Sequence, residues 1–217
     1  MPPKLYADIS SPAVRSVLLL SKAINLDLDI QSLDISTGEH LTPVFMKMNP
    51  QHTVPTLEDN NFILWDSHAI CAYLMNKYSE NDDLYPKNPE LRATIDQRMH
   101  FDSGILFPKY LAVIEPILKE GAKMISKDKA HSLSAAYGIL ETFLEHSRFV
   151  AGKKLSIADF CIATTITTAN VLVPVAENRF PGISKWLANI KELPYYEEAN
   201  QKGLDKFTGL VKFRMGH

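Results

Sequence analysis

The stretch NPQHTVPTLEDNNFILWDSHAI, from Asn49 to Ile70, decides the fold of the N-terminal part of the chain. Proline cannot donate a hydrogen bond to a sheet ladder, so Pro55 belongs at the start of a strand, where we expect a cis bond after Val54. The turn signal DNN separates two strand-like segments, Thr56 to Glu58 and Phe62 to Trp65. The stretch therefore predicts a β-hairpin that the chain enters through a proline.

Strand and helix patterns alternate on both sides of this hairpin. Alternating side chains indicate strands, and apolar side chains at helical spacing indicate helices. The segments expected are strands at Lys4–Ile9 and Leu28–Ile35 and helices at Ala13–Asn25, Pro43–Met48 and Asp66–Tyr78. Their order predicts a small α/β domain.

A polar segment with two prolines follows, which is typical of a linker. We expect an α/β domain over residues 1–79, a linker over 80–90 and an all-helical domain over 91–217. The first helix of that domain should run from Leu91 to about Gly121, with kinks or interruptions at Pro108 and Pro116. Further helices are expected at Lys129–His146, at Ile157–Leu172 and around Ile183–Ile190, with a last short helix starting at Pro194.

The helix expected at Ile157–Leu172 is apolar nearly all round, which indicates a buried position at the centre of a helical bundle. Ser156 and Asp159 open it with the spacing of a capping box, Asp standing where Glu or Gln is usual. We assign these two residues a structural role.

The composition excludes several classes of protein. The chain has 217 residues, 46% of them apolar, and a net charge of -2. No run of Lys or Arg exceeds two residues, which is unlike a nucleic-acid binder, and the apolar fraction is too high for a disordered chain. No signal-like or membrane-spanning run is visible, and Cys71 and Cys161 fall within helical patterns as small apolar residues. We expect a soluble cytoplasmic protein without disulfides.

Two serines precede a proline in ISSPAVRS, Ile9 to Ser16. A serine before Pro12 suits the N-cap of a helix. The turn could equally direct free N–H groups and the positive helix end at an anion, to which Ser10 or Ser11 could donate a hydrogen bond. The motif alone leaves both interpretations open.

A second candidate site lies in the stretch quoted at the outset. The strand-initiating Pro55 should leave the N–H and C=O of Val54 free to pair with an extended peptide. Asp66 and Ser67 either cap the next helix or meet a ligand, the helix end facing a carboxylate and Asp66 an ammonium. With His40 and His52 nearby, these features suggest a pocket for a small peptide. No histidine shows metal-ligand spacing, so we assign no metal site.

The chain resembles the cytosolic glutathione transferases, and most closely the insect delta and epsilon classes, with epsilon favoured. The matching segments are SSPAVRS, TGEHLTPVFMKMNPQHTVPTL, DSHAI, HFDSGILF, FVAGKKLSIADF and ELPYYEEAN, which run from the first strand to the last helix. The resemblance implies a thioredoxin-like N-terminal domain with a mixed four-stranded sheet, an all-α C-terminal domain and a homodimer. It also implies glutathione as co-substrate.

The resemblance implies roles for single residues. Ser11 matches the family's catalytic serine, whose hydroxyl donates to the glutathione thiolate. The residues implied to bind glutathione are His40, His52, Thr53, Val54, Pro55, Asp66 and Ser67. Two positions depart from the pattern: the family more often has Glu where Asp66 stands, and close epsilon relatives can carry Arg where Leu111 stands.

The second substrate should be a hydrophobic electrophile bound between the domains. The residues expected to line its site are Phe107, Tyr110, Leu111, Ile114, Leu118 and Phe207. Dehydrochlorination or peroxidase side activity is known in these classes. One alternative is a low-turnover carrier of hydrophobic ligands with the same fold. Another is a glutathione-dependent isomerase of the zeta type, whose SSxxxR turn usually contains a cysteine that is absent here.

Overall fold

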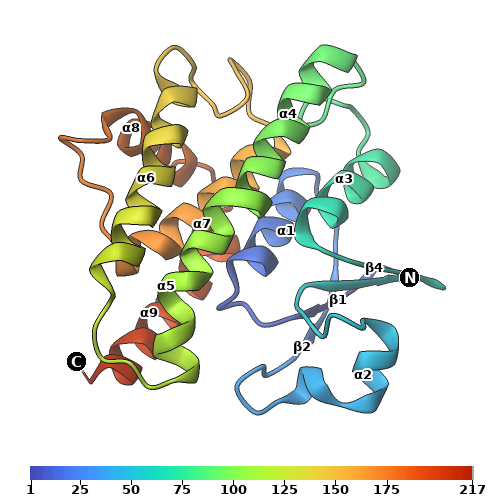
Figure 1. The fold of residues 1–217 in the computed structure, drawn as a ribbon. Helices are drawn as coiled ribbons and strands as arrows, with labels where there is room; N and C mark the ends of the chain where they lie inside the picture. The colour runs from blue at the N-terminus through green and yellow to red at the C-terminus, as the bar shows by residue number, and fades with distance from the viewer. Residues whose placement is uncertain (217) are drawn as a thin grey trace.

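Four strands form one mixed sheet in the N-terminal part of the chain (Figure 1). The computed structural model describes residues 1–216. The strands are β1 (Lys4–Ala7), β2 (Asp29–Ser32), β3 (Thr56–Asp59) and β4 (Phe62–Trp65), in the order β2-β1-β3-β4. Strand β1 pairs parallel with β2 and antiparallel with β3, which forms the hairpin with β4. The predicted hairpin and the mixed four-stranded sheet are confirmed, and the Val54–Pro55 bond is cis as expected.

Helices cover both faces of this sheet. They are α1 (Pro12–Ala23), α2 (Pro43–Met48) and α3 (Ser67–Tyr78), with a 3-10 turn at Glu39–Leu41. Figure 1 shows α1 and α3 on one side of the sheet and α2 on the other. Helix α1 begins at Pro12, directly after Ser11, because proline is suited to the first turn of a helix.

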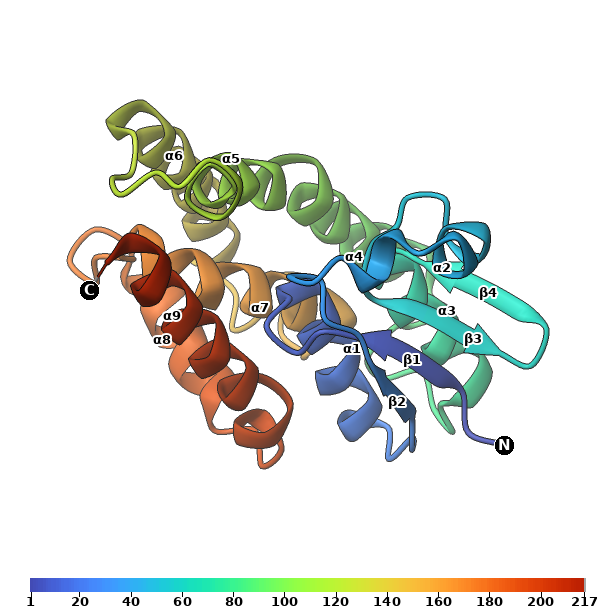
Figure 2. The ribbon, with the colours of Figure 1, turned by 90° about the horizontal axis from the view of Figure 1, so that it is seen from below.

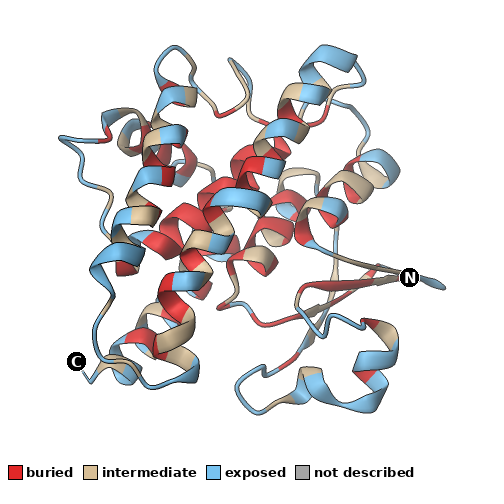
Figure 3. Cartoon of the chain, in the orientation of Figure 1, coloured by how far each residue is buried: buried red, intermediate tan, exposed pale blue. Residues whose placement is uncertain are grey.

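The rest of the chain is helical. The elements are α4 (Pro89–Phe101), η2 (Asp102–Leu106), α5 (Phe107–Lys119), α6 (Lys127–Leu144), α7 (Ile157–Leu172), α8 (Pro181–Lys191), η3 (Glu197–Gln201) and α9 (Lys202–Met215). Helix α7 lies in the middle and is buried along most of its length (Figure 3), which confirms its predicted central position. It packs against α1, so the two halves of the chain share one core. Helix α9 packs against α5 and α7, and Figure 2 shows it at the edge of the helical part of the chain. Within residues 1–216, no helix has the length and apolarity that a membrane crossing requires.

The long helix predicted from Leu91 is interrupted, as expected. The feature that interrupts it was not predicted. A π-helical segment, η2, separates α4 from α5. Pro108 is the second residue of α5, where its missing N–H is not needed. Pro116 does not interrupt the helix, because α5 continues through this residue to Lys119.

The last helix is longer than the short one predicted. A second π-helical segment, η3, leads directly into α9, which has 14 residues. Leu204, Phe207 and Val211 are all buried, at spacings that place them on one face of the helix. That face holds α9 against the bundle.

Asp159 does more than complete the predicted capping box, which the structure confirms. Its Oδ2 accepts from the N–H and the hydroxyl of Ser156, both at 2.9 Å. Its Oδ1 accepts from the backbone N–H of Val150 at 2.9 Å and from Nε1 of Trp186 at 3.0 Å. Burial raises the pKa of Asp159 to about 6. One carboxylate therefore joins α7, α8 and the segment before α7.

We predict that Asp159→Ala lowers the free energy of unfolding by about 3–5 kcal/mol, because it leaves four donors without an acceptor in the core. Urea denaturation measures this change. Asp128→Ala is the matched control, since Asp128 is exposed on α6. A variant as stable as the wild type would show that Asp159 does not hold the helical domain together.

Candidate functional site

A cavity of about 220 Å³ opens where α1, α3, η2 and α7 meet. Five of the residues predicted to bind glutathione line it, namely Thr53, Val54, Pro55, Asp66 and Ser67. Phe107, predicted for the electrophile site, lines it too. The rest of the wall was not predicted from the sequence; it is formed by Ala13, Ser16, Gln51, His68, Asp102, Ser103, Cys161, Thr164 and Thr165. The structure thus brings the hairpin entrance and the start of α3 to one hollow.

The two serines before α1 have different surroundings. Ser10 is buried, and its hydroxyl donates to Oδ1 of Asp8 at 2.9 Å. Ser11 is half-buried and stands at the N-cap position, but its side chain makes no capping hydrogen bond. Its hydroxyl therefore lies beside the positive end of α1 without serving as the cap. Ser11 borders the start of α1, although it is not part of the wall of the 220 Å³ cavity.

The backbone at Val54 has the free groups that the sequence predicts. Neither its N–H nor its C=O pairs with another backbone group within residues 1–216. The turn before it is fixed by Asn49, whose buried amide donates to the carbonyl of Thr53 at 3.1 Å and to Oγ1 of Thr56 at 2.9 Å. Asn49 therefore holds the segment that presents Val54 to the cavity.

Asp66 caps α3 in an unusual backbone conformation. Its Oδ1 accepts from the N–H groups of His68 at 2.9 Å and of Ala69 at 3.1 Å. Its φ of 73° lies in the left-handed region, which costs a residue other than glycine on the order of 1–3 kcal/mol. The side chain stays about half exposed at the cavity. The capping role is present, and a free carboxylate edge remains for a ligand.

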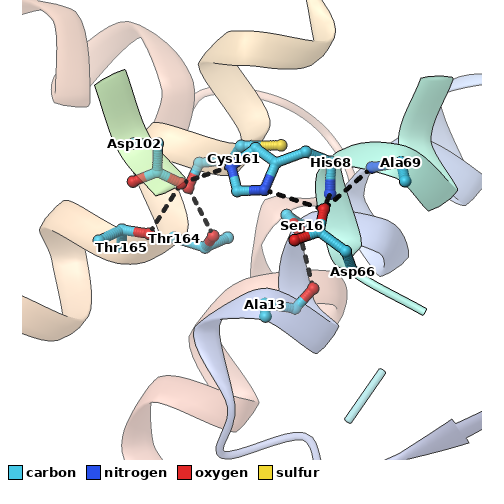
Figure 4. A network of polar contacts seen from close by, with 9 residues as sticks. All are labelled: Ala13, Ser16, Asp66, His68, Ala69, Asp102, Cys161, Thr164 and Thr165. Carbon is cyan, nitrogen blue, oxygen red and sulfur yellow. Dashed lines mark hydrogen bonds and ion pairs between the residues drawn. The ribbon is translucent and has the colours of Figure 1, made fainter. Parts of the chain in front are cut away.

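Figure 4 shows a chain of polar contacts behind Asp66 that joins the two halves of the molecule. Nδ1 of His68 lies 3.4 Å from Oδ1 of Asp66, and Nε2 lies 2.9 Å from Oδ2 of Asp102. Asp102 is buried in η2 and accepts from Oγ1 of Thr165 at 3.3 Å. In the adjoining turn of α7, Thr164 donates to the carbonyl of Cys161 at 3.0 Å.

This network sets the protonation of its members. Burial disfavours the charged imidazole of His68, but Cys161, Asp102 and Asp66 outweigh it and raise the pKa of His68 to about 11. Burial raises the pKa of Asp102. The contact with His68 is the main reason that the pKa of Asp66 is lowered. At neutral pH, Asp66 is therefore an anion with a cation directly behind it.

His68 and Asp102 both lie in segments quoted for the family resemblance, but no pattern in the sequence links one to the other. They are 34 residues apart and belong to α3 and η2. The signal available was a polar residue within an otherwise apolar helical face at each position. Only the packing of α3 on α7 brings them together.

The two predicted histidines are not part of the cavity wall and form a pair of their own. The ring centroids of His40 and His52 are 6.1 Å apart. Burial and the proximity of His52 lower the pKa of His40. Within residues 1–216, no group of three or more His, Cys, Asp or Glu side chains is placed to hold a metal ion.

The residues predicted for the electrophile site differ in exposure. Phe107, Leu111 and Leu118 are half-buried, whereas Tyr110 and Phe207 are almost fully buried and Ile114 lies in the core. Three aromatic rings form a row: the centroids of Phe107 and Tyr110 are 5.7 Å apart, and those of Tyr110 and Phe207 are 6.3 Å apart. The row runs from the cavity toward α9.

We predict that the stabilising contribution of His68 depends on pH. The folded-state pKa is raised from 6.5 to about 11, so this contribution is fully present below pH 6.5 and is lost as pH rises toward 11. The difference in unfolding free energy between wild type and His68→Gln should therefore be larger near pH 6 than near pH 9. The same comparison in an Asp102→Asn background should show less dependence on pH. A difference that stays constant in the wild-type background would contradict a charged His68.

Comparisons with known proteins agree with this geometry. Two family models match the chain, the glutathione S-transferase N-terminal domain over residues 1–76 and the C-terminal domain over residues 94–194. An epsilon-class glutathione S-transferase from the housefly, Musca domestica, is 41% identical, with 98% of each chain covered and a TM-score of 0.95. A delta-class glutathione transferase of Nilaparvata lugens is 40% identical over 98% of this chain and 100% of its own, with a TM-score of 0.92.

A third solved structure holds a ligand. A glutathione transferase homologue from Drosophila mojavensis, with bound glutathione, is 37% identical and has a TM-score of 0.95. The match covers 98% of this chain and 97% of that one. The matches extend over both halves of the chain, the thioredoxin-like sheet domain and the helical domain. The chain belongs to the glutathione S-transferase family, and the enzyme is a glutathione transferase.

Proposed function

We propose that the enzyme conjugates glutathione to hydrophobic electrophiles and that Ser11 activates the thiol. The observation that carries this proposal is the contrast between the two serines. The hydroxyl of Ser10 donates a hydrogen bond to Asp8, whereas the hydroxyl of Ser11 makes no capping hydrogen bond and lies at the positive end of α1. A donor in that position stabilises a thiolate, which is the nucleophile.

The energies of these two effects are sufficient for catalysis at neutral pH. A hydrogen bond to a charged group contributes about 1.5–3 kcal/mol, and a helix N-terminus about 0.3–1 kcal/mol. One pKa unit corresponds to about 1.4 kcal/mol, so together they lower a thiol pKa of about 8.5 to between about 5.5 and 7. The serine acts as a donor rather than as a base, and the sulfur attacks the electrophile.

The rest of glutathione would lie along the cavity wall. The free backbone groups of Val54 suit the cysteinyl unit, and the start of α3 suits the γ-glutamyl unit. There Ser67 and the helix end face its carboxylate, and the ionised Asp66 faces its ammonium. His40 and His52 would face the glycine end of glutathione. Thr53 would lie between this end and the cysteinyl unit. The glutathione bound to the Drosophila mojavensis homologue supports glutathione as the ligand.

The electrophile would bind against the aromatic row at Phe107, Tyr110 and Phe207, with Leu111 and Leu118 beside it. Ile114 supports this wall from the core. An apolar site with few fixed polar groups accepts many hydrophobic compounds. We propose detoxification as the role, including insecticide metabolism by dehydrochlorination or peroxidase side activity. The two free, buried cysteines suit a reducing compartment such as the cytoplasm.

We predict that Ser11→Ala strongly lowers kcat/KM at neutral pH and that activity partly recovers at alkaline pH. The substitution removes a donor needed mainly by the thiolate, so the pKa of the bound thiol rises while glutathione affinity changes little. The measurement is the pH dependence of kcat/KM toward a chlorodinitrobenzene-type electrophile.

Ser10→Ala is the matched control, with the same atoms removed one position earlier. It should have much less effect on the pH profile. An alkaline shift in Ser10→Ala and none in Ser11→Ala would reverse the assignment. A wild-type enzyme that binds glutathione but conjugates no electrophile would instead favour a carrier.

We also propose a two-fold dimer formed by α3 and α4, as the family resemblance implies. Large apolar side chains are exposed on this part of the chain: Phe62 on β4 is 46% exposed and Leu91 on α4 is 53% exposed. An isologous contact would cover such side chains on both copies.

Sedimentation velocity at micromolar concentration should therefore give about twice the 24.4 kDa mass of the chain. Phe62→Asp should shift the equilibrium toward monomer. Phe213→Asp is the matched control, because Phe213 is equally apolar and 79% exposed on α9. A monomeric wild type at this concentration would rule the dimer out.

A further inference from the structure

Asp8 shapes the turn that carries Ser11. It follows β1 directly and is only 6% exposed. Its Oδ1 accepts from the N–H of Ser10 at 3.0 Å and from the hydroxyl of Ser10 at 2.9 Å. Its carbonyl accepts from the N–H of Ser11 at 2.9 Å. The position of Ser11 therefore depends on where this carboxylate is held.

A residue from the other end of the chain contacts the same oxygen. Nζ of Lys206, on α9, lies 2.9 Å from Oδ1 of Asp8. The lysine side chain is 56% exposed, so the pair lies at the edge of the protein with its acid inside. A second acid, Asp34, also lies within electrostatic range of Lys206. Lys206 is thus the cationic end of a contact between α9 and the serine turn.

The backbones also meet at this point. Gly203 lies almost one turn before Lys206 on α9. A Cβ at this position would lie 2.1 Å from the carbonyl oxygen of Ile9 and 2.6 Å from Cδ of Arg15. Only glycine allows so close an approach. Helix α9 is therefore in direct contact with the turn, and the ion pair fixes one side of that contact.

Such a pair contributes little to overall stability. An ion pair with a largely solvated lysine is weak, so folding does not depend on it. Small displacements of a reacting group, however, change rates by large factors. Phe207, the next residue, closes the aromatic row against Tyr110. The same turn of α9 therefore touches both the serine turn and the proposed electrophile wall.

We propose that Lys206 is a positioning residue, which holds the turn of Ser11 in its productive position through Asp8. The C-terminal helix would then act on the reacting sulfur as well as on the electrophile. This inference rests on the proposed role of Ser11. It assigns to Lys206 no contact with either substrate.

The kinetic test compares lysine variants on the same helix. Lys206→Met should lower kcat by about three- to tenfold while the KM for glutathione changes less than about twofold. Lys206→Arg, which can restore the ion pair, should stay within about twofold of wild type. Lys212→Met removes an exposed lysine farther along α9 and should leave both parameters unchanged.

A double-mutant cycle tests whether Lys206 acts through Asp8. Asp8→Asn keeps an oxygen for Ser10 but loses the charge, so it should lower kcat about as much as Lys206→Met. The double variant should be no slower than either single variant, because both remove the same contact. Independent, additive losses would show that Lys206 does not act through Asp8.

Amide hydrogen exchange provides a readout that does not require turnover. The N–H groups of Ser10 and Ser11 both bond to Asp8, so they should exchange faster in Lys206→Met than in Lys212→Met. Unchanged exchange together with wild-type kcat would overturn the inference. A wild type that conjugates no electrophile would contradict the proposed function, whereas an active wild type with unaffected variants contradicts only the role of Lys206.

Discussion

The buried guanidinium of Arg15 joins the two halves of the enzyme, and the site depends on that junction. Arg15 projects from the first turn of α1 and is completely buried. It donates to Oδ1 of Asn200 in η3 at 2.6 Å and to Oγ1 of Thr168 in α7. Burial lowers the pKa of Arg15 to about 10, so the group remains charged at neutral pH. A charge without a carboxylate partner is expensive to bury, and these neutral acceptors keep α1 in one place between the halves.

Two consequences follow from fixing α1 in this way. Its N-terminus, with Ser11, faces the region where the sheet domain meets the helical domain. Its other side packs against α7, which brings Asp102 and Thr165 up behind His68. The enzyme thereby places a donor and a helix end at the proposed thiolate position. It also places a buried cation, His68, behind Asp66 in the wall of the cavity.

The sequence was sufficient for features that depend on local chemistry. The hairpin after Pro55, the start of α1 at Pro12 and the box formed by Ser156 and Asp159 follow from backbone constraints within a few residues. The pairing of His68 with Asp102 could not be predicted, because it depends on how α3 packs on the helical domain. The full length of α9 and its contact with Asp8 were missed for the same reason, since the two partners are 198 residues apart. The continuation of α5 through Pro116 could not be predicted either, because a proline inside a helical pattern locally favours a break.

The proposed role of Ser11 requires that the entrance of α1 lowers the pKa of the thiol of bound glutathione. Its most direct test is an ultraviolet absorbance titration of the thiolate in the binary complex of wild-type enzyme and glutathione. We expect an apparent thiol pKa at least about one unit below the value of about 8.5 for the free thiol. A bound thiol that titrates like free glutathione would contradict it.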